Sequence, residues 1–231
     1  MSRLYVLRAL AYNNVHQYDK ALGDIEQAIV LAPKDPEGYL NRAKIYNWTQ
    51  KYDKAIEDCD KTLSLDSRYK EAYCVRAMAY IASGQTAKGL EDINKTIGIN
   101  PRLDQSYGLR AQAYLNLSEF DKAISDCDKV ISYNPKLPQP YGIRAQALLR
   151  LKHYDKALED CNRAIGLDPT LPQIYGIRAE VYIATQEFDK AIADCDKAIS
   201  LQPQLHEAYV LKAKAVKEKA APTGLHSIFP F

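Results

Sequence analysis

The sequence predicts an all-α solenoid, a stack of antiparallel helix pairs, and two observations carry this prediction. A set of residues recurs every 34 positions along almost the whole chain, which is typical of repeat architectures. Within each period the apolar residues lie three and four positions apart, on one face of a helix. A helix pair with apolar residues on more than one side cannot bury them alone, so neighbouring pairs must stack.

The first half of each period is marked by an aromatic residue and, three positions later, by an Arg-Ala pair. The aromatic residues are Tyr5, Tyr39, Tyr73, Tyr107, Tyr141, Tyr175 and Tyr209. The arginines are Arg8, Arg42, Arg76, Arg110, Arg144 and Arg178, each followed by an alanine. A further tyrosine follows at Tyr12, Tyr46, Tyr80, Tyr114 and Tyr182, with Leu148 as the exception. This half predicts the first helix of each pair.

The second half predicts another helix and its end. It carries an aromatic residue and then an alanine, as Phe120 and Ala123 do, followed by apolar residues at helical spacing. Prolines close most periods, at Pro33, Pro101, Pro135, Pro169 and Pro203. Because proline cannot continue a helix cheaply, the second helix is expected to end just before it.

This order of aromatic, small and proline residues resembles the tetratricopeptide repeat, and the resemblance covers about residues 2–220. It implies a right-handed superhelical solenoid that forms a single domain over 2–220. The expected parts are six repeats, at 2–35, 36–69, 70–103, 104–137, 138–171 and 172–205, and a C-terminal capping helix at 206–220. Residues 221–231 fit no repeat and are expected to form a disordered tail.

Composition and motifs exclude several classes of function. The 31 Lys and Arg against 29 Asp and Glu leave a net charge of +2, without the basic excess of a nucleic-acid-binding protein. No apolar run is long enough to span a membrane. The sequence lacks a phosphate-binding glycine loop, a GxSxG nucleophile motif and metal-ligand spacing among its histidines and cysteines. We therefore expect a non-enzymatic protein with no cofactor and no metal.

The five cysteines indicate a reducing, cytoplasmic location. Their number is odd, and successive repeats lie too far apart for disulfides. We interpret them as small buried thiols; they are Cys59, Cys74, Cys127, Cys161 and Cys195.

An aspartate recurs in each second helix and has two interpretations. It can form an ion-paired ladder between helices, or it can contact a ligand. The residues are Asp24, Asp58, Asp92, Asp126, Asp160 and Asp194.

The functional residues are expected on a second stripe of the first helices, facing the inside of the solenoid. In the fourth repeat the stripe is Gln105, Gly108, Gln112, Leu115 and Asn116. In the fifth it is Gln139, Gly142, Gln146, Leu149 and Arg150, and in the sixth Gln173, Gly176, Glu180 and Ile183. The family resemblance implies that an extended peptide or partner segment binds along this concave groove, so the chain is expected to be a scaffold or adaptor.

Three glycines and one tryptophan in these helices have alternative interpretations. Gly108, Gly142 and Gly176 either open three evenly spaced pockets or permit close helix packing, or they reflect recent duplication. Trp48, the only tryptophan, is either an aromatic anchor in the groove or a partly buried structural residue. The stripe lacks the lysines with which one subgroup of the family holds the terminal carboxylates of chaperone tails, which argues against that ligand.

An alternative function is that of a structural or self-associating module that uses its ends or convex face. The first helix is unusually apolar for an outermost helix, with Leu4, Val6, Leu7 and Leu10. Self-association through the N-terminal end is expected to depend on Leu4, Val6 and Leu10.

Overall fold

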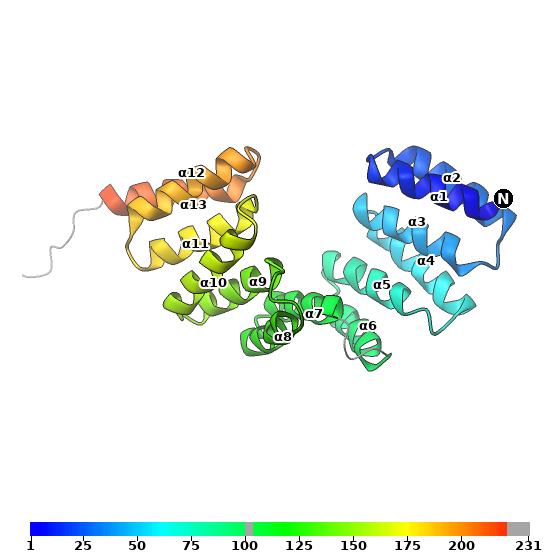
Figure 1. Cartoon of the computed structure of the whole chain (residues 1–231), viewed down its shortest axis with the longest axis horizontal. Coiled ribbons are helices and arrows are strands. Elements are labelled where there is room, and N and C mark those ends of the chain that lie inside the picture. Colours follow the sequence, from blue (N-terminus) through cyan, green and yellow to red (C-terminus); the bar gives the residue numbers. More distant parts are fainter. Residues whose placement is uncertain (100–103, 221–231) are drawn as a thin grey trace, which may run out of the picture. The chain divides into compact units, whose positions relative to one another are not determined.

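The computed structural model describes residues 1–99 and 104–220. Every regular element in these ranges is an α-helix (Figure 1), and none of these helices is long and apolar enough to cross a membrane. Pro101 and the predicted tail at 221–231 lie outside the described residues. The helices are α1 (Ser2–Asn14), α2 (Tyr18–Leu31), α3 (Pro36–Trp48), α4 (Tyr52–Leu65), α5 (Lys70–Ala82), α6 (Thr86–Ile99), α7 (Asp104–Asn116), α8 (Phe120–Tyr133), α9 (Gln139–Arg150), α10 (Tyr154–Leu167), α11 (Pro172–Ala184), α12 (Phe188–Leu201) and α13 (His206–Ala220).

The helices fall into two compact units. Unit 1 is Met1–Leu117 and holds α1–α7, and unit 2 is Ser118–Phe231 and holds α8–α13. The predicted repeat at 104–137 thus has its first helix in unit 1 and its second in unit 2. A single domain over 2–220 remains a prediction.

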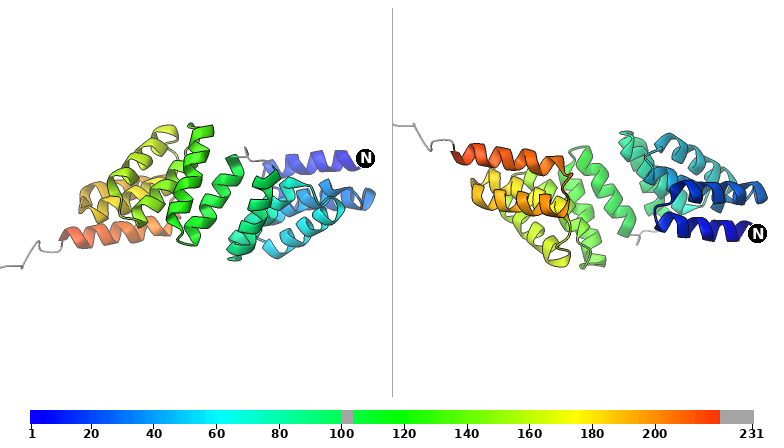
Figure 2. Two further views of the ribbon diagram at one scale, coloured as in Figure 1. Left: turned by 90° about the horizontal axis from the view of Figure 1, so that it is seen from below. Right: turned by 90° about the horizontal axis from the view of Figure 1, so that it is seen from above.

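Within each unit the helices form antiparallel pairs that stack on the next pair (Figures 1 and 2). In unit 1 the pairs are α1 with α2, α3 with α4 and α5 with α6, and α7 packs on α6. In unit 2, α9 pairs with α10 and α11 with α12, while α8 packs on α9 and α13 packs on α12. The predicted all-α architecture of stacked helix pairs is confirmed.

Alanines lie where the helices approach most closely. Two series of alanines, one in the first helices and one in the second helices, are fully buried, with 0 % exposure. They are Ala9, Ala43, Ala77, Ala111, Ala145 and Ala179 in the first helices, and Ala21, Ala55, Ala123, Ala157 and Ala191 in the second. Larger side chains close the core around them, such as Ile25, Ile93 and Val181. A larger residue at an alanine position would overpack the contact between the helices.

The turn inside each pair and the link between pairs both follow the period. One turn residue per period has a positive φ: His16, Gln50, Gly84, Ser118, Lys152 and Gln186. The first aromatic of a repeat then donates a hydrogen bond to the carbonyl that closes the previous repeat, as Tyr141 does to Pro135 (3.2 Å) and Tyr175 to Pro169 (3.2 Å). In the one period without proline, the Ser67 carbonyl accepts the bond from Tyr73 at 3.0 Å. The tyrosine therefore needs the carbonyl and not the proline ring.

The arginine and aspartate series form a ladder inside the helix pairs. Arg42 donates to both carboxylate oxygens of Asp58 at 2.7 Å, and Arg178 does the same to Asp194. The same pair of hydrogen bonds, a bidentate contact, joins Arg8 to Asp24, Arg76 to Asp92 and Arg144 to Asp160. The aspartates are buried while the arginines reach the surface. For these five aspartates the ladder interpretation is confirmed.

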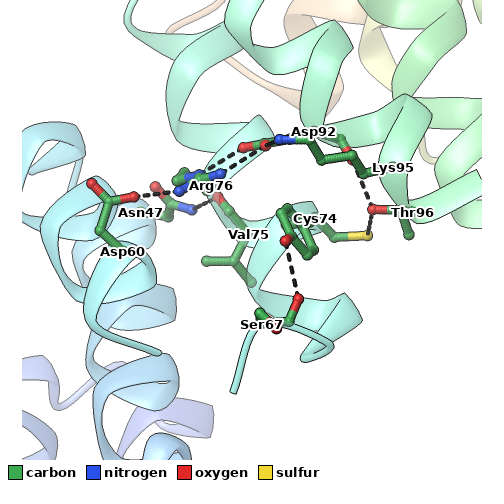
Figure 3. Close-up of polar contacts among 10 residues, drawn as sticks. Asn47, Asp60, Ser67, Cys74, Val75, Arg76, Asp92, Lys95 and Thr96 are labelled. Atoms are coloured by element: carbon green, nitrogen blue, oxygen red, sulfur yellow. Dashed lines mark hydrogen bonds and ion pairs between the residues drawn. The ribbon is translucent and has the colours of Figure 1, made fainter. Parts of the chain in front are cut away.

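In several repeats the ladder also joins a first helix to the second helix of the preceding pair. Figure 3 shows Arg76 between Asp92 of its own pair and Asp60 of the preceding second helix. Arg144 reaches back to Asp128 in the same way, and Lys212 of α13 to Asp196 at 2.6 Å. Asparagines replace the second acid for Arg110 (Asn94, 2.8 Å) and Arg178 (Asn162, 2.6 Å). One cation thus connects three helices.

The cysteines are free thiols, as predicted, and four of the five are buried. Burial raises the pKa of the Cys195 thiol to about 11 and those of Cys127 and Cys161 to about 12, so they stay protonated at neutral pH. Cys74 is half-buried, and its sulfur lies 3.7 Å from the Thr96 hydroxyl and 3.8 Å from that of Ser106.

Candidate functional site

Unit 2 has a pocket of about 290 Å³ on the inner stripe predicted for its first helices. Leu149 of α9 and Ile183 of α11 occupy equivalent positions in successive repeats and are both buried. Together with Tyr154 and Leu211 they form its apolar lining. Charged side chains complete the pocket: Arg150, Lys152, Glu180 and Lys214. The pocket brings together four residues that the sequence predicted: Leu149, Arg150, Glu180 and Ile183.

Glu180 is the electrostatic centre of this pocket. It is half-buried, and burial raises the pKa of its carboxyl group above the ordinary value of 4.5, with Glu207 acting in the same direction. The nearby cations Arg150 and Lys214 act in the opposite direction. Within the described part of the chain, no hydrogen bond or ion pair is formed by the Glu180 carboxylate. The pocket therefore offers an unpaired acid flanked by three cations.

Unit 1 has a pocket of about 250 Å³ at the equivalent place, between α3, α4 and α5. Trp48 is 69 % exposed here, so its interpretation as a partly buried structural residue is wrong: it stands at the end of α3, where the helix leaves the core. The pocket is mainly apolar and is lined by Lys44, Asn47, Trp48, Tyr52, Val75, Met78 and Ala82.

The two pockets use matching positions of the repeat with different chemistry. Trp48 corresponds to Arg150, and Tyr52 corresponds to Tyr154, three repeats later. Asn47 corresponds to Leu149 and donates from its side-chain nitrogen to the Val75 carbonyl at 2.9 Å. The Asn47 side-chain oxygen is buried without a hydrogen-bond partner in the described structure. We call each of these pockets, with the residues that line it, the first-helix face of its unit.

Gly142 does not open a pocket, and that interpretation of it is wrong. A Cβ atom built on Gly142 meets Cδ1 of Ile174, from the next first helix, well inside contact distance. The glycine is buried because the Ile174 side chain occupies the space beside it. Gly142 therefore permits close packing of neighbouring repeats, which was the alternative interpretation.

Gly176 lies in a different environment from Gly142. Apart from its chain neighbours and the backbone of its own helix, no described atom lies within 4 Å of a Cβ built on it, and the residue equivalent to Ile174 in the following helix is the small Ala208. Gly108 of α7 likewise has no described atom within 4 Å of such a Cβ. Equal spacing in the sequence therefore does not give equal pockets.

The remaining predicted residues lie on the expected helices but outside these two pockets. In α7, Gln105 and Asn116 are exposed, Leu115 is buried and Gln112 donates to the Asn116 side chain at 3.0 Å. Gln139 and Gln173 are exposed near the starts of α9 and α11, and Gln146 is half-buried. The α7 residues belong to unit 1 and those of α9 and α11 to unit 2.

Several pocket residues were missed by the sequence reasoning. Tyr52 and Tyr154 begin the second helices, Lys152 lies in the turn before Tyr154, and Leu211 and Lys214 belong to α13. The signal that could have found them was their repeat position beside the stripe. In the described residues, no group of three or more His, Cys, Asp or Glu side chains is arranged to hold a metal ion.

Comparison with solved structures shows the same fold. A tetratricopeptide repeat protein from Parabacteroides merdae is 22 % identical, with a TM-score of 0.77 over 94 % of this chain and 86 % of that one. The APC/C hetero-tetramer Cut9-Hcn1 gives a TM-score of 0.85 at 16 % identity, over 94 % of this chain. Here the chain spans only 43 % of the length of the matched protein. YrrB, described as a TPR protein with an unusual peptide-binding site, gives 0.59 at 20 % identity, over 82 % of this chain and 97 % of that one.

Comparison with curated protein sequences finds no match. Two family models, both described as tetratricopeptide repeat, match five consecutive segments: 36–69, 70–103, 104–137, 138–171 and 172–205. These segments equal five of the six repeats predicted from the period, and they cover well over half of the chain. The chain therefore belongs to the tetratricopeptide repeat family.

Proposed function

We propose that this protein is a non-catalytic adaptor that binds an extended segment of a partner protein on a first-helix face. The observation that carries the proposal is the presence of pockets at the same repeat positions in both units, each combining apolar lining with unpaired polar groups. Pockets of a few hundred Å³ with a few convergent polar groups are typical of binding sites. The family as a whole consists of protein-interaction modules, and YrrB is described as having a peptide-binding site.

The two pockets favour different side chains of a partner. Trp48 and Met78 offer a flat and a flexible apolar surface, which suits aliphatic or aromatic anchors. Around Glu180 the three cations outnumber the single acid, so an apolar side chain next to an acidic one suits the unit 2 pocket. Each pocket is therefore expected to select its own kind of partner side chain.

The proposal is tested with peptides selected from a random display library on the intact protein. Trp48 reports binding directly, because it is the only tryptophan and lies in a pocket. For peptides that bind unit 2, Lys214→Glu is expected to weaken affinity about tenfold or more, since charge reversal in a desolvated contact costs over 1.4 kcal/mol. Lys217→Glu is the matched control on the same helix, outside the pocket.

For peptides that perturb Trp48 fluorescence, Met78→Glu is the corresponding variant, and Val30→Glu is its control on an exposed apolar residue of α2. Circular dichroism establishes that each variant keeps its helicity. The proposal would be contradicted if a pocket variant and its control lost the same amount of peptide affinity. It would also be contradicted if the selected peptides bound both pocket variants as tightly as the wild type.

A second candidate function, self-association through α1, is favoured by one observation. Leu4 and Leu7 of α1 are 64 % and 57 % exposed. Val6, which the sequence placed with this surface, is buried in the core instead. Light scattering over a concentration series tests the idea: Leu4→Asp is expected to abolish association and Val216→Asp, on α13, to leave it unchanged. If light scattering gives the mass of a monomer for the wild type at every concentration, self-association through α1 is excluded.

A further inference from the structure

In three repeats of this protein, an arginine of the ladder lies between two tyrosine rings. The Arg76 guanidinium is 5.6 Å from the centre of the Tyr73 ring and 6.0 Å from that of Tyr80. Arg178 lies 5.6 Å and 5.9 Å from Tyr175 and Tyr182, and Arg110 has the same arrangement with Tyr107 and Tyr114. The second ring of each set comes from the tyrosine series in which Leu148 is the exception.

A lysine of the following second helix also lies over this second ring. The Lys88 ammonium is 5.4 Å from the Tyr80 ring centre and that of Lys190 is 5.3 Å from Tyr182. Lys20 and Lys54 lie over Tyr12 and Tyr46 in the same way. The tyrosine is thus a neutral ring beside cations, an arrangement in which each contact contributes about 0.5–1 kcal/mol at a solvent-exposed site.

The fifth repeat keeps the cations but lacks the ring. Arg144 lies 5.6 Å from the Tyr141 ring, and Lys156 is equivalent to Lys88 and Lys190. Between them stands Leu148, only 8 % exposed, which fills the inner part of the space and stops short of the surface. A pocket of about 320 Å³ remains, lined by Ile124, Asp128, Arg144, Leu148, Lys156, Glu159 and Asp160.

The charges around this pocket favour a neutral, flat occupant. Asp160 and Asp128 already accept hydrogen bonds from the edges of the Arg144 guanidinium. Its face toward Leu148 is not covered by a ring, unlike the corresponding face of Arg178. The two cations and three acids leave a formal charge of −1, which disfavours an anion, while Ile124 and Leu148 form an apolar floor. No residue of this pocket belongs to either first-helix face.

We infer that this pocket binds the side chain of a tyrosine presented by a partner protein, which completes the fifth repeat as its own tyrosine completes the others. The internal repeats identify the occupant, because every other group around the pocket has its counterpart in a repeat where a tyrosine ring is present. The site lies between α8, α9 and α10 within unit 2, so it gives the protein a second recognition surface.

The first experiment titrates the protein with p-cresol, which is the tyrosine side chain as a free molecule. Binding is monitored by the methyl NMR signals of Leu148 and Ile124. Saturable shifts of these signals are expected. The control is 4-methylcyclohexanol, similar in size but without an aromatic face, which is expected to bind about tenfold more weakly because it forgoes two cation–π contacts. Equal affinity for the two compounds, or the absence of saturable shifts with p-cresol, would overturn the inference.

Two reciprocal variants locate the site. Leu148→Tyr fills the pocket as the other repeats do, so p-cresol binding is expected to disappear while the melting temperature stays the same or rises. Tyr182→Leu recreates the pocket beside Arg178 and Lys190, and is expected to add a second p-cresol site. Undiminished binding to Leu148→Tyr, or a failure of folded Tyr182→Leu to gain a site, would contradict the assignment.

The source of the ring is decided with N-acetyl-tyrosinamide, in which the side chain carries a peptide backbone. It is expected to compete with p-cresol for the pocket and to shift the same methyl signals. If p-cresol binds but N-acetyl-tyrosinamide does not, the pocket admits free phenols only, and a protein tyrosine is excluded as its occupant.

Discussion

Gly142 and Gly176 are the same residue in the same helical position, yet their surroundings differ because of one side chain in the next repeat. Ile174 packs over Gly142, whereas the equivalent residue after Gly176 is Ala208. A glycine in a helix costs roughly 0.5–1 kcal/mol relative to alanine. At Gly142 that cost is offset by the burial of an isoleucine side chain, and at Gly176 no packing contact offsets it.

Gly142→Val is expected to destabilise the fold by about 1–3 kcal/mol, because its side chain and that of Ile174 compete for one space. Gly176→Val is the matched control, since it carries the same change in helix propensity into open space. The measurement is the free energy of unfolding from urea titration. Adding Ile174→Ala to Gly142→Val is expected to recover part of the lost unfolding free energy. Equal stability of the two valine variants would show that Ile174 does not clash with a side chain at position 142.

The raised pKa of Glu180 makes a residue-scale prediction about pH. Because the folded protein holds this proton more tightly than the unfolded chain, Glu180 favours folding below its ordinary pKa of 4.5. That contribution is lost as the pH rises through the folded-state pKa. Glu180→Gln cannot ionise, so it is expected to be more stable than the wild type at pH 7, with the difference shrinking toward pH 4. Urea titrations at several pH values measure this, and a difference that grows on acidification would refute it.

At the scale of the helix pair, the turn residue with positive φ determines how the second helix begins. Five of the six described turns place a non-glycine residue there, including Gln186 at φ +64 and Lys152 at φ +61. The left-handed conformation crowds a Cβ atom against the backbone. Gly84, the sixth of these turn residues, is the one best suited to the left-handed conformation, at φ +81.

Gln186→Gly is therefore expected to stabilise the protein by about 0.5–1 kcal/mol, because it removes strain at an exposed turn. The reverse change, Gly84→Ala, is expected to destabilise by about 1 kcal/mol. Thermal unfolding of both variants measures the effect. A lower melting temperature for Gln186→Gly would mean that the entropy lost on ordering a glycine outweighs the relief of strain.

At the scale of the whole molecule, the Arg-Asp ladder repeats in both units and joins successive helix pairs. Its aspartates are nearly inaccessible to water, so an arginine removed from the ladder leaves a buried carboxylate without its partner. This differs from the exposed ion pairs elsewhere on the surface, which contribute about 0–1 kcal/mol.

Arg178→Met is expected to cost roughly 2–3 kcal/mol, because it removes two charge-assisted hydrogen bonds from buried Asp194. Lys219→Met, which removes an exposed pair with Asp189, is the control and is expected to change stability by less than about 0.5 kcal/mol. Denaturant titrations compare the two. Restoration of stability in the double variant Arg178→Met/Asp194→Leu would attribute the loss to the unpaired acid.

Much of the candidate site was predictable because it follows the repeat. Leu149, Arg150, Glu180 and Ile183 share one stripe of the first helices, and helical spacing is visible in the sequence. Leu211 and Lys214 of α13 lie at the repeat positions of Ile177 and Glu180, but the sequence alone does not show that their side chains line this pocket. A contact between elements depends on which two helices become neighbours and on how far their side chains reach.

The order of amino acids alone predicts the all-helical architecture, the 34-residue period and the positions of the packed alanines, and it leaves two interpretations for the aspartate series. These features are local or repeat at a fixed spacing, so one period contains their cause. The packing of the helices was needed to show that Gly142 is covered and Gly176 is open, that Trp48 is exposed, and that a pocket remains beside Arg144 at Leu148. Each of these depends on how the side chains of neighbouring helices fill the space between them, which no single period contains.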